Sequence, residues 1–342
     1  MADSLYFGKD SIQVEELAKP DRDNGSNNWA ISGAKTKSGA PILCNDPHLG
    51  LNLPSIWYEM QISTPAFNAY GATFPGAPYI IIGFNDSCAF GFTNGGRDVR
   101  DYYEIRFKDD SRNEYWFNNE WKKTTFRYEK IKVAGKPDFI DTVAYTIFGP
   151  VMYDKSFSGK RAGNGKNYAV RWTAHDPSNE LMLFNVLNRA GNYDDYSKAV
   201  LNLQTPGQNV VFACKNGDIA IRTQGDFPAK WKGQGDFVMP GTDTAYLWQG
   251  MIPQDEVPFQ YNPERGFVSS ANQKPVDDST YHYYLGRDYP VYRGIAINRR
   301  LREMNGITPQ DMMALQTDNL DVCAQMLQPL FLANIREAEL DA

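Results

Sequence analysis

The pattern of apolar and polar residues predicts several short strands in the first half of the chain. Residues 29–33 and 41–44 are short apolar stretches bounded by Gly, Pro and Asn, which is typical of strands that end in turns. Residues 79–84 form a continuous apolar run whose length suits a buried strand. Residues 124–133 alternate large or β-branched side chains with charged ones, which is the period of a half-exposed strand.

Two later stretches predict helices. Residues 180–203 are rich in Leu, Met, Asn and Ala, and Gly191 divides them into two segments. Thr308 and Pro309 have the identities favoured at a helix N-cap and at the first helical position. A helical pattern runs from there to about Leu340. Helices inserted into a β-rich chain indicate the α+β class or a layered α/β arrangement.

Composition narrows the class of protein. The length of 342 residues suits about two domains of ordinary size or one large domain. Apolar residues make up 42% of the chain and charged residues 22%, which is enough apolar material for a large core. The chain has no run of about 18 apolar residues, so no membrane partner is expected. The formal net charge is −6 without any basic block, so nucleic acid is not an expected partner.

The common catalytic and metal motifs are missing from the sequence. The four cysteines are widely spaced and form no CxxC pair, which weakens a zinc or redox interpretation. The three histidines are accompanied by no GxSxG, HExxH or phosphate-binding loop. The base of an enzyme with this sequence therefore need not be a histidine.

A series of polar segments in a fixed order carries the strongest functional signal. Gly25 and Ser26 stand where a polar lead-in meets the first strand, and residues 45–50 follow as Asn-Asp-Pro-His-Leu-Gly. Residues 91–94 and 204–209 each end in asparagine. The order and spacing of these segments resemble the penicillin acylase (penicillin amidase) family of N-terminal nucleophile (Ntn) hydrolases. Further segments that fit the resemblance are residues 227–230, 238–241, 261–267, 270–272 and 292–294.

The resemblance implies a fold and a reaction. The family fold is a four-layer αββα sandwich, here expected as a partial large (β) chain. The reaction is hydrolysis of a linear amide after self-cleavage between Gly25 and Ser26, which leaves Ser26 as nucleophile and its α-amine as base. The backbone N–H of Asn94 and the side chain of Asn209 are the implied oxyanion donors. His48 is implied beside Ser26 as an orienting group.

The resemblance also implies a calcium site and a substrate pocket. Asp98, Asp101 and the carbonyl of Arg100 match the family's calcium loop, and oxygen ligands suit that hard cation. The positions that would line the acyl pocket are apolar, which favours a hydrophobic acyl group. Lys230 stands where family members often carry an arginine near the substrate or the α-amine. The implied acyl-pocket residues are Leu49, Ile82 and Phe92.

The resemblance further implies processing and partners. Residues 1–25 are expected to be the end of a spacer, and residues 26–342 a large-chain segment that is incomplete at its C-terminus. The small (α) chain of the same precursor is the expected protein partner, and a small-molecule amide the expected substrate. The family resemblance favours a periplasmic or secreted location, although this segment carries no signal.

Several alternatives remain open at this stage. The substrate is either a β-lactam side-chain amide or, as in other members of the same family, an N-acyl homoserine lactone. A β-rich module that binds a ligand without catalysis would explain the 13% of aromatic residues but not the ordered motifs. An uncut precursor would keep the fold without turnover.

Overall fold

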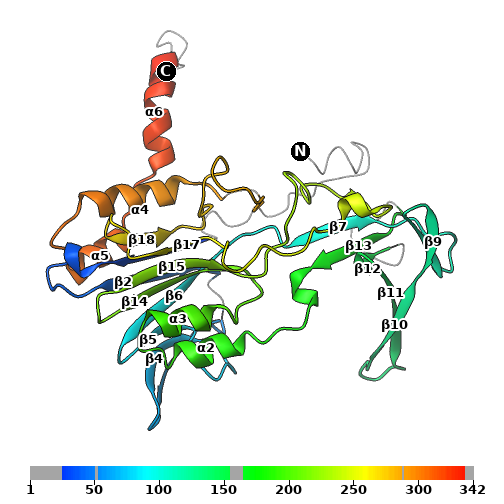
Figure 1. Cartoon of the computed structure of the whole chain (residues 1–342), viewed down its shortest axis with the longest axis horizontal. Helices are drawn as coiled ribbons and strands as arrows, with labels where there is room; N and C mark the ends of the chain where they lie inside the picture. The colour runs from blue at the N-terminus through cyan, green and yellow to red at the C-terminus, as the bar shows by residue number, and fades with distance from the viewer. Residues whose placement is uncertain (1–24, 51–52, 155–164, 287–288, 336–342) are drawn as a thin grey trace.

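The computed structural model describes residues 25–50, 53–154, 165–286 and 289–335, and its larger part is built from two stacked antiparallel sheets (Figure 1). The smaller sheet has the order β18 (Phe267–Ser270), β1 (Gly25–Ile31) and β2 (Ile42–His48). The larger sheet has seven strands, in the order β17 (Phe259–Tyr261), β15 (Ile219–Gln224), β14 (Gln208–Cys214), β6 (Cys88–Asn94), β5 (Ile82–Asn85), β4 (Asn68–Thr73) and β3 (Tyr58–Ser63).

Helices cover the outer faces of both sheets, with α4 (Tyr292–Glu303) and α5 (Pro309–Gln316) on one side and α2 (Leu181–Leu187) and α3 (Tyr193–Val200) on the other in Figure 1. Helices α2 and α3 pack on the seven-stranded sheet, and buried residues of both join its core. Helices α4 and α5 pack on the three-stranded sheet in the same way. The order helix, sheet, sheet, helix confirms the α+β class and the four-layer αββα sandwich.

Alternate side chains of the strands fill different layers of this sandwich. Val210 and Phe212 of β14 point into the core under α2 and α3, whereas Val211 points into the core between the sheets. Trp29 of β1 packs under α4 and α5, and its neighbour Ala30 lies between the sheets. Because successive strand residues point to opposite faces, a continuous apolar run such as that of β14 suits a sheet that is covered on both sides.

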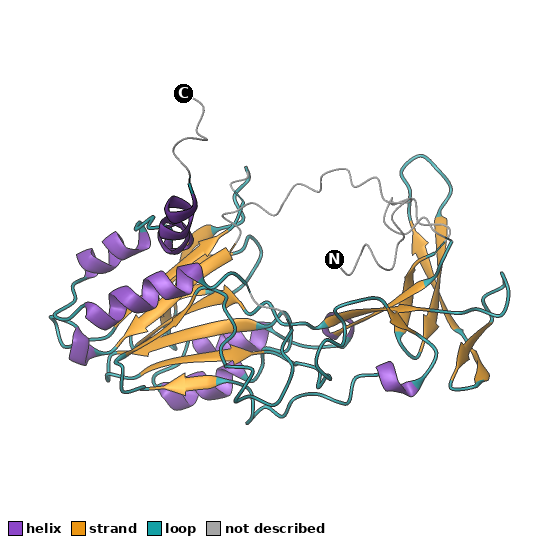
Figure 2. Ribbon diagram, turned by 90° about the horizontal axis from the view of Figure 1, so that it is seen from above, coloured by secondary structure: helices purple, strands orange, loops and turns teal. Residues whose placement is uncertain are grey.

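A separate six-stranded sheet extends to one side of the sandwich, as Figure 1 and Figure 2 show. Its apolar core includes Tyr103, Phe148 and Met239. The strands have the order β10 (Thr125–Ile131), β11 (Phe139–Thr146), β12 (Gly149–Tyr153), β13 (Tyr168–Trp172), β7 (Arg100–Glu104) and β16 (Met239–Pro240), and the hairpin of β8 (Glu114–Phe117) and β9 (Glu120–Lys123) lies beside them. In the described part of the chain, the short 3₁₀ helices are η1 (Gly33–Lys35), η2 (Thr173–His175) and η3 (Thr244–Tyr246).

Most predicted elements are confirmed, and two predictions are wrong in extent. The predicted strand over 79–84 begins only at Ile82, because the N–H and C=O of Ile80 bond to the carboxamide of Asn188 at the end of α2 (2.8 Å each). The single long helix after Thr308 is two helices. α5 ends at Gln316, and α6 (Val322–Asn334) begins after a polar turn with Asp321 as its N-cap.

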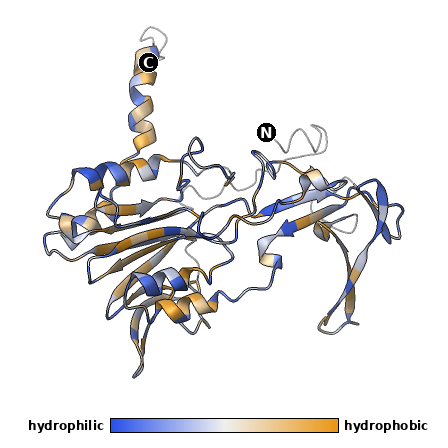
Figure 3. Ribbon diagram, viewed as in Figure 1, coloured by the Kyte–Doolittle hydropathy of each residue, from blue (hydrophilic) through white to orange (hydrophobic). Residues whose placement is uncertain are grey.

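Helix α6 stands away from the sandwich and carries several apolar residues on its surface (Figure 3). Its exposed residues include Leu330, Phe331 and Leu332. Among the helices that the structure describes, this one included, none combines the length and apolar character that crossing a bilayer requires.

Candidate active site

The ends of four strands meet at one edge of the two stacked sheets. Ser26 lies at the start of β1 and Asn94 at the end of β6. Asn209 lies at the start of β14, and Asn272 follows the end of β18. Direct hydrogen bonds join Asn272 to both Ser26 and Asn94, and the carboxamide of Asn209 also donates to the carbonyl oxygen of Asn94. The fold thus brings Ser26 and the predicted asparagines into one polar cluster.

Ser26 is buried, with 6% of its surface exposed, and its two polar groups have specific partners. Its hydroxyl donates to the carbonyl oxygen of Gly25 at 2.6 Å. Its backbone N–H donates to Oδ1 of Asn272 at 2.8 Å. The side chain of Ser26 therefore lies directly on the peptide bond that links it to Gly25.

Asn272 is held in an unusual backbone conformation. Its φ of 71° lies in the left-handed region, which asparagine tolerates better than most residues. Its N–H donates to the hydroxyl of Ser270 at 3.1 Å, and its Nδ2 donates to the carbonyl of Asn94 at 3.0 Å. These bonds direct the carboxamide of this fully buried residue between Ser26 and Asn94.

Arg293 of α4 completes the cluster. Its Nη1 donates to the carbonyl of Ser26 (2.9 Å) and to Oδ1 of Asn27 (2.7 Å), and its Nη2 donates to Oδ1 of Asn272 (2.9 Å). A Cβ at Gly25 would lie 2.5 Å from this Nη2, so glycine allows the guanidinium to approach the backbone. The segments containing Asn272 and Arg293 fit the family resemblance in sequence, but the sequence assigned neither residue a role.

We expect Arg293→Ala to lower the free energy of unfolding by about 2–4 kcal/mol, because several buried acceptors lose their donor together. The exposed Arg299 on the same helix is a matched control, and Arg299→Ala should change the free energy by less than about 0.5 kcal/mol. Urea unfolding followed by tryptophan fluorescence measures both. Equal, small changes in the two variants would contradict the bracing role of Arg293.

His48 lies opposite Gly25 in the β1–β2 ladder. Its Nε2 is 2.8 Å from Oδ2 of Asp46 and 3.3 Å from Nδ2 of Asn27. The histidine is thus one residue away from Ser26 in register, and its ring nitrogen faces Asp46. The predicted orienting role stays a prediction.

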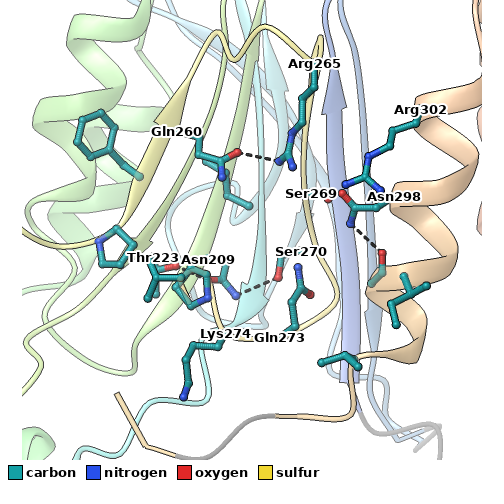
Figure 4. Close-up of a pocket in the computed structure, with 18 of the residues that line it drawn as sticks. Asn209, Thr223, Gln260, Arg265, Ser269, Ser270, Gln273, Lys274, Asn298 and Arg302 are labelled. Atoms are coloured by element: carbon teal, nitrogen blue, oxygen red, sulfur yellow. Dashed lines mark hydrogen bonds between the residues drawn. The ribbon is translucent and has the colours of Figure 1, made fainter. Parts of the chain in front are cut away.

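The carboxamide of Asn209 is fully engaged with neighbouring side chains. Its Nδ2 donates to Thr93 and Ser270 hydroxyls at 3.2 and 3.0 Å, and its Oδ1 accepts from Thr223 at 2.6 Å. A polar cavity of about 510 Å³ between β15, β18 and α4 borders Asn209 and Ser270 (Figure 4). Its described lining includes neither Ser26 nor Asn272.

The three predicted pocket residues divide into two groups. Phe92 belongs to the core under α2 and α3, where Ile82 packs against the same cluster. The rings of Phe92 and Phe184 are 5.6 Å apart. Leu49 lies apart from this cluster and is 46% exposed. The structure therefore joins Ile82 and Phe92 in one apolar environment.

The predicted substrate residue Lys230 and the predicted calcium ligands form one cluster. The Nζ of Lys230 is 2.8 Å from Oδ1 of Asp101 and 3.1 Å from Oδ2 of Asp98. Burial raises the pKa of Asp98 to about 6, against the opposing effect of the nearby ammonium. The buried Lys230 therefore faces the buried carboxylate of Asp101 and the half-buried carboxylate of Asp98. Arg100, which lies between the two aspartates in sequence, is exposed.

Comparison with known proteins gives matches over nearly the whole chain. The family model for penicillin amidase matches residues 4–342. The acyl-homoserine lactone acylase QuiP of Pseudomonas aeruginosa is 27% identical over 315 residues, covering 90% of this chain and 37% of that protein. The penicillin acylase 2 proenzyme of Pseudomonas sp. (strain SE83) is 27% identical over 300 residues, with 86% and 38% covered. The chain thus spans well under half of the length of these relatives.

A solved structure shares the fold. The thermostable penicillin G acylase from Alcaligenes faecalis superposes with a TM-score of 0.75 at 24% sequence identity. The match covers 93% of this chain and 56% of that chain. The arrangement of layers described above is therefore one that a known acylase also adopts.

Proposed function

This chain belongs to the penicillin amidase family, and from that premise we propose that it is an amide hydrolase with Ser26 as nucleophile. One observation carries the proposal: the buried Asn272 carboxamide binds the backbone nitrogen of Ser26, and the Ser26 hydroxyl contacts the carbonyl of Gly25. A loop serine without a catalytic role does not need both groups held by buried partners. The arrangement suits a residue that first cleaves its own peptide bond and then acts on substrates.

Self-cleavage is the first proposed step. The Ser26 Oγ attacks the Gly25 carbonyl carbon, and the C–N bond breaks as the nitrogen of Ser26 takes up a proton. The resulting ester between Gly25 and Ser26 is hydrolysed by water, which returns the hydroxyl and releases the Gly25 carboxylate. The product is a serine with a free α-amine, already within 2.8 Å of the Asn272 carboxamide oxygen.

The free amine is the proposed general base. A free α-amine has a pKa of about 7.7–8.0, so a useful fraction is neutral at pH 7–8. Asn272 Oδ1 accepts one of its N–H groups and leaves its lone pair for the Ser26 hydroxyl proton. The acyl group of the substrate passes to Oγ, the amine product leaves with the proton, and water then hydrolyses the acyl-enzyme. We propose that His48 orients this residue across the β1–β2 ladder.

The oxyanion donors are proposed to be the backbone N–H of Asn94 and the Nδ2 of Asn272. Hydrogen-bonded and non-bonded pairs alternate along an antiparallel ladder. The N–H of Gly95 bonds to the carbonyl of Gly207 at 2.9 Å, so the preceding Asn94 directs its N–H away from β14. Asn209, predicted from the sequence, has its carboxamide committed to Thr93, Ser270 and Thr223. The Asn272 carboxamide also bonds to Asn94, but it alone of the two contacts Ser26 directly, which makes Asn272 the better-placed donor.

The acyl group is proposed to be hydrophobic, because Ile82 and Phe92 share an apolar cluster, and Phe92 lies two residues before Asn94 on β6. The relatives include proteins named as penicillin acylases and as acyl-homoserine lactone acylases. We propose that the substrate is a penicillin-type side-chain amide, with an N-acyl homoserine lactone as the alternative. Phenylacetyl amides and N-acyl homoserine lactones of rising chain length separate the two.

A small chain of the same precursor is proposed as the partner that closes this pocket. Leu49, Leu53 and Ile56 are exposed apolar residues in the segment after β2. Exposed apolar side chains of this kind suit a protein contact. Co-expression with that small chain should raise amide hydrolysis if the pocket is shared.

Intact mass and N-terminal sequencing of the purified chain test the proposed cleavage. We expect fragments of 25 and 317 residues (342 − 25), with the larger one beginning Ser-Asn-Asn-Trp. A chain that remains whole from Met1 would contradict self-cleavage, because Ser26 would then have no free amine.

A further inference from the structure

A buried lysine lies where the family resemblance implies a calcium ion. The Lys230 ammonium contacts Asp101 at 2.8 Å and Asp98 at 3.1 Å. The side chains of Lys230 and Asp101 are 1% and 0% exposed. The two carboxylates that would bind the metal thus both pair with the ammonium of a lysine of the same chain.

The remaining ligand positions of Asp101 are also occupied. Its Oδ2 accepts from Nε1 of Trp248 at 2.5 Å, and the ring of Trp248 lies 5.5 Å from the Lys230 ammonium. Both oxygens of Asp101 are therefore satisfied by donors from the chain. A cation–π contact adds to the stabilisation of the ammonium in this place.

The backbone closes around the three charged groups. Gly235 has a φ of +92°, and a Cβ there would collide with Oδ1 of Asp101 and lie 3.0 Å from Nζ of Lys230. Gly286 approaches Asp98 from another segment, where a Cβ would lie 2.7 Å from the Asp98 Cβ. Two glycines in the left-handed region thus let the chain pack tightly on the cluster.

These residues do not fit a calcium ion. Calcium takes about 6–8 oxygen ligands at about 2.3–2.6 Å, and here an ammonium lies within hydrogen-bond reach of both carboxylates. Among the residues that the structure describes, no group of three or more Asp, Glu, His or Cys side chains is arranged to hold a metal. Lysine and calcium would compete for one position.

We infer that the Lys230 ammonium replaces the calcium ion and holds together the loop between Asn94 and β7. Asp98 lies four residues after Asn94, and Asp101 lies in β7, so the lysine ties the segment after the proposed oxyanion strand to the six-stranded sheet. The chain keeps this segment in place without a metal. The inference concerns stability and stands apart from the proposed reaction.

Thermal unfolding of the wild-type chain is the first test and needs no variant. The midpoint should be the same, within about 1 °C, in EDTA and in about 5 mM calcium, a concentration above the Kd of weak calcium modules. A calcium-dependent rise of more than about 3 °C that is absent in Asp101→Asn would overturn the inference.

Variants of Lys230 test the role of the ammonium. Lys230→Met should lower the midpoint by roughly 6–10 °C, because it leaves the buried carboxylate of Asp101 and the half-buried one of Asp98 without their cation. Adding Asp101→Asn should recover about half of that loss, because one uncompensated charge is removed. The exposed Lys232 is the matched control, and Lys232→Met should change little. Equal midpoints for the two Lys→Met variants would overturn the inference.

Discussion

Ser26→Ala is expected to leave the chain uncut and to lower amide hydrolysis by more than about 10⁴-fold, because the nucleophile, and with it the step that frees the base, is lost. Serine and α-amine belong to one residue, so a single change removes both functions. The fold should survive, since the substitution removes the hydrogen bond from the hydroxyl to the Gly25 carbonyl and leaves the backbone bond to Asn272 in place. The free energy of unfolding should change by about 1 kcal/mol or less.

Intact mass after treatment with phenylmethanesulfonyl fluoride gives a second readout of the same variant. The wild-type large fragment should gain one sulfonyl group, and Ser26→Ala should gain none. Ser38 lies on the exposed turn between β1 and β2, and Ser38→Ala should be cut, labelled and active as the wild type is. Labelling that persists in Ser26→Ala would show that another residue is the nucleophile.

Individual strands and helices could be anticipated because they depend on local pattern, whereas the four-layer arrangement was implied by the family resemblance. The period of two in residues 125–131 and the break at Gly191 are visible in the sequence, and β10, α2 and α3 follow them. α4 was missed because its exposed face carries several arginines and only Gly294, Ile297 and Leu301 are buried. Most of its helical stability comes from packing on the three-stranded sheet, and a short stretch of sequence does not reveal that packing.

The site was harder to predict because its residues meet through the sheet. Ser26 and Asn272 are 246 positions apart, and antiparallel pairing of β1 with β18 brings them together. Asn209 was the expected side-chain donor because the family resemblance implied it. The left-handed turn that aims the carboxamide of Asn272 at Ser26 has no sequence signal that distinguishes it from other turns.

The roles of the charged residues were hard to predict for the same reason, because their partners are distant in sequence. Asp98, Asp101 and Lys230 were each predicted to bind something outside the chain, since each carries a charge at a family-like position. Their distances show that they bind one another. The sequence does not show which charged side chains pair in the folded chain. A charged side chain that is buried against a partner is not free to bind a ligand.

Asn272→Gly is expected to lower kcat by about 10²–10³-fold with a smaller change in KM, which is the usual effect of losing one oxyanion donor. Glycine is the better replacement than alanine, because it adopts a φ of 71° without strain and so isolates the side chain. The α-amine also loses the acceptor at 2.8 Å, so the pH dependence of kcat should move as well. Steady-state kinetics on a phenylacetyl amide measures both quantities.

Asn209→Ala separates the two asparagines. Its carboxamide bonds to Thr93, Ser270 and Thr223 between the sheets, so its loss should lower the free energy of unfolding by about 2–3 kcal/mol. Its kcat should fall less than about tenfold, because the donor beside Ser26 remains. If Asn209→Ala instead loses kcat by the larger factor and Asn272→Gly keeps it, then Asn209 is the oxyanion donor, and the contact between Asn272 and Ser26 serves only to hold β1 against the end of β18.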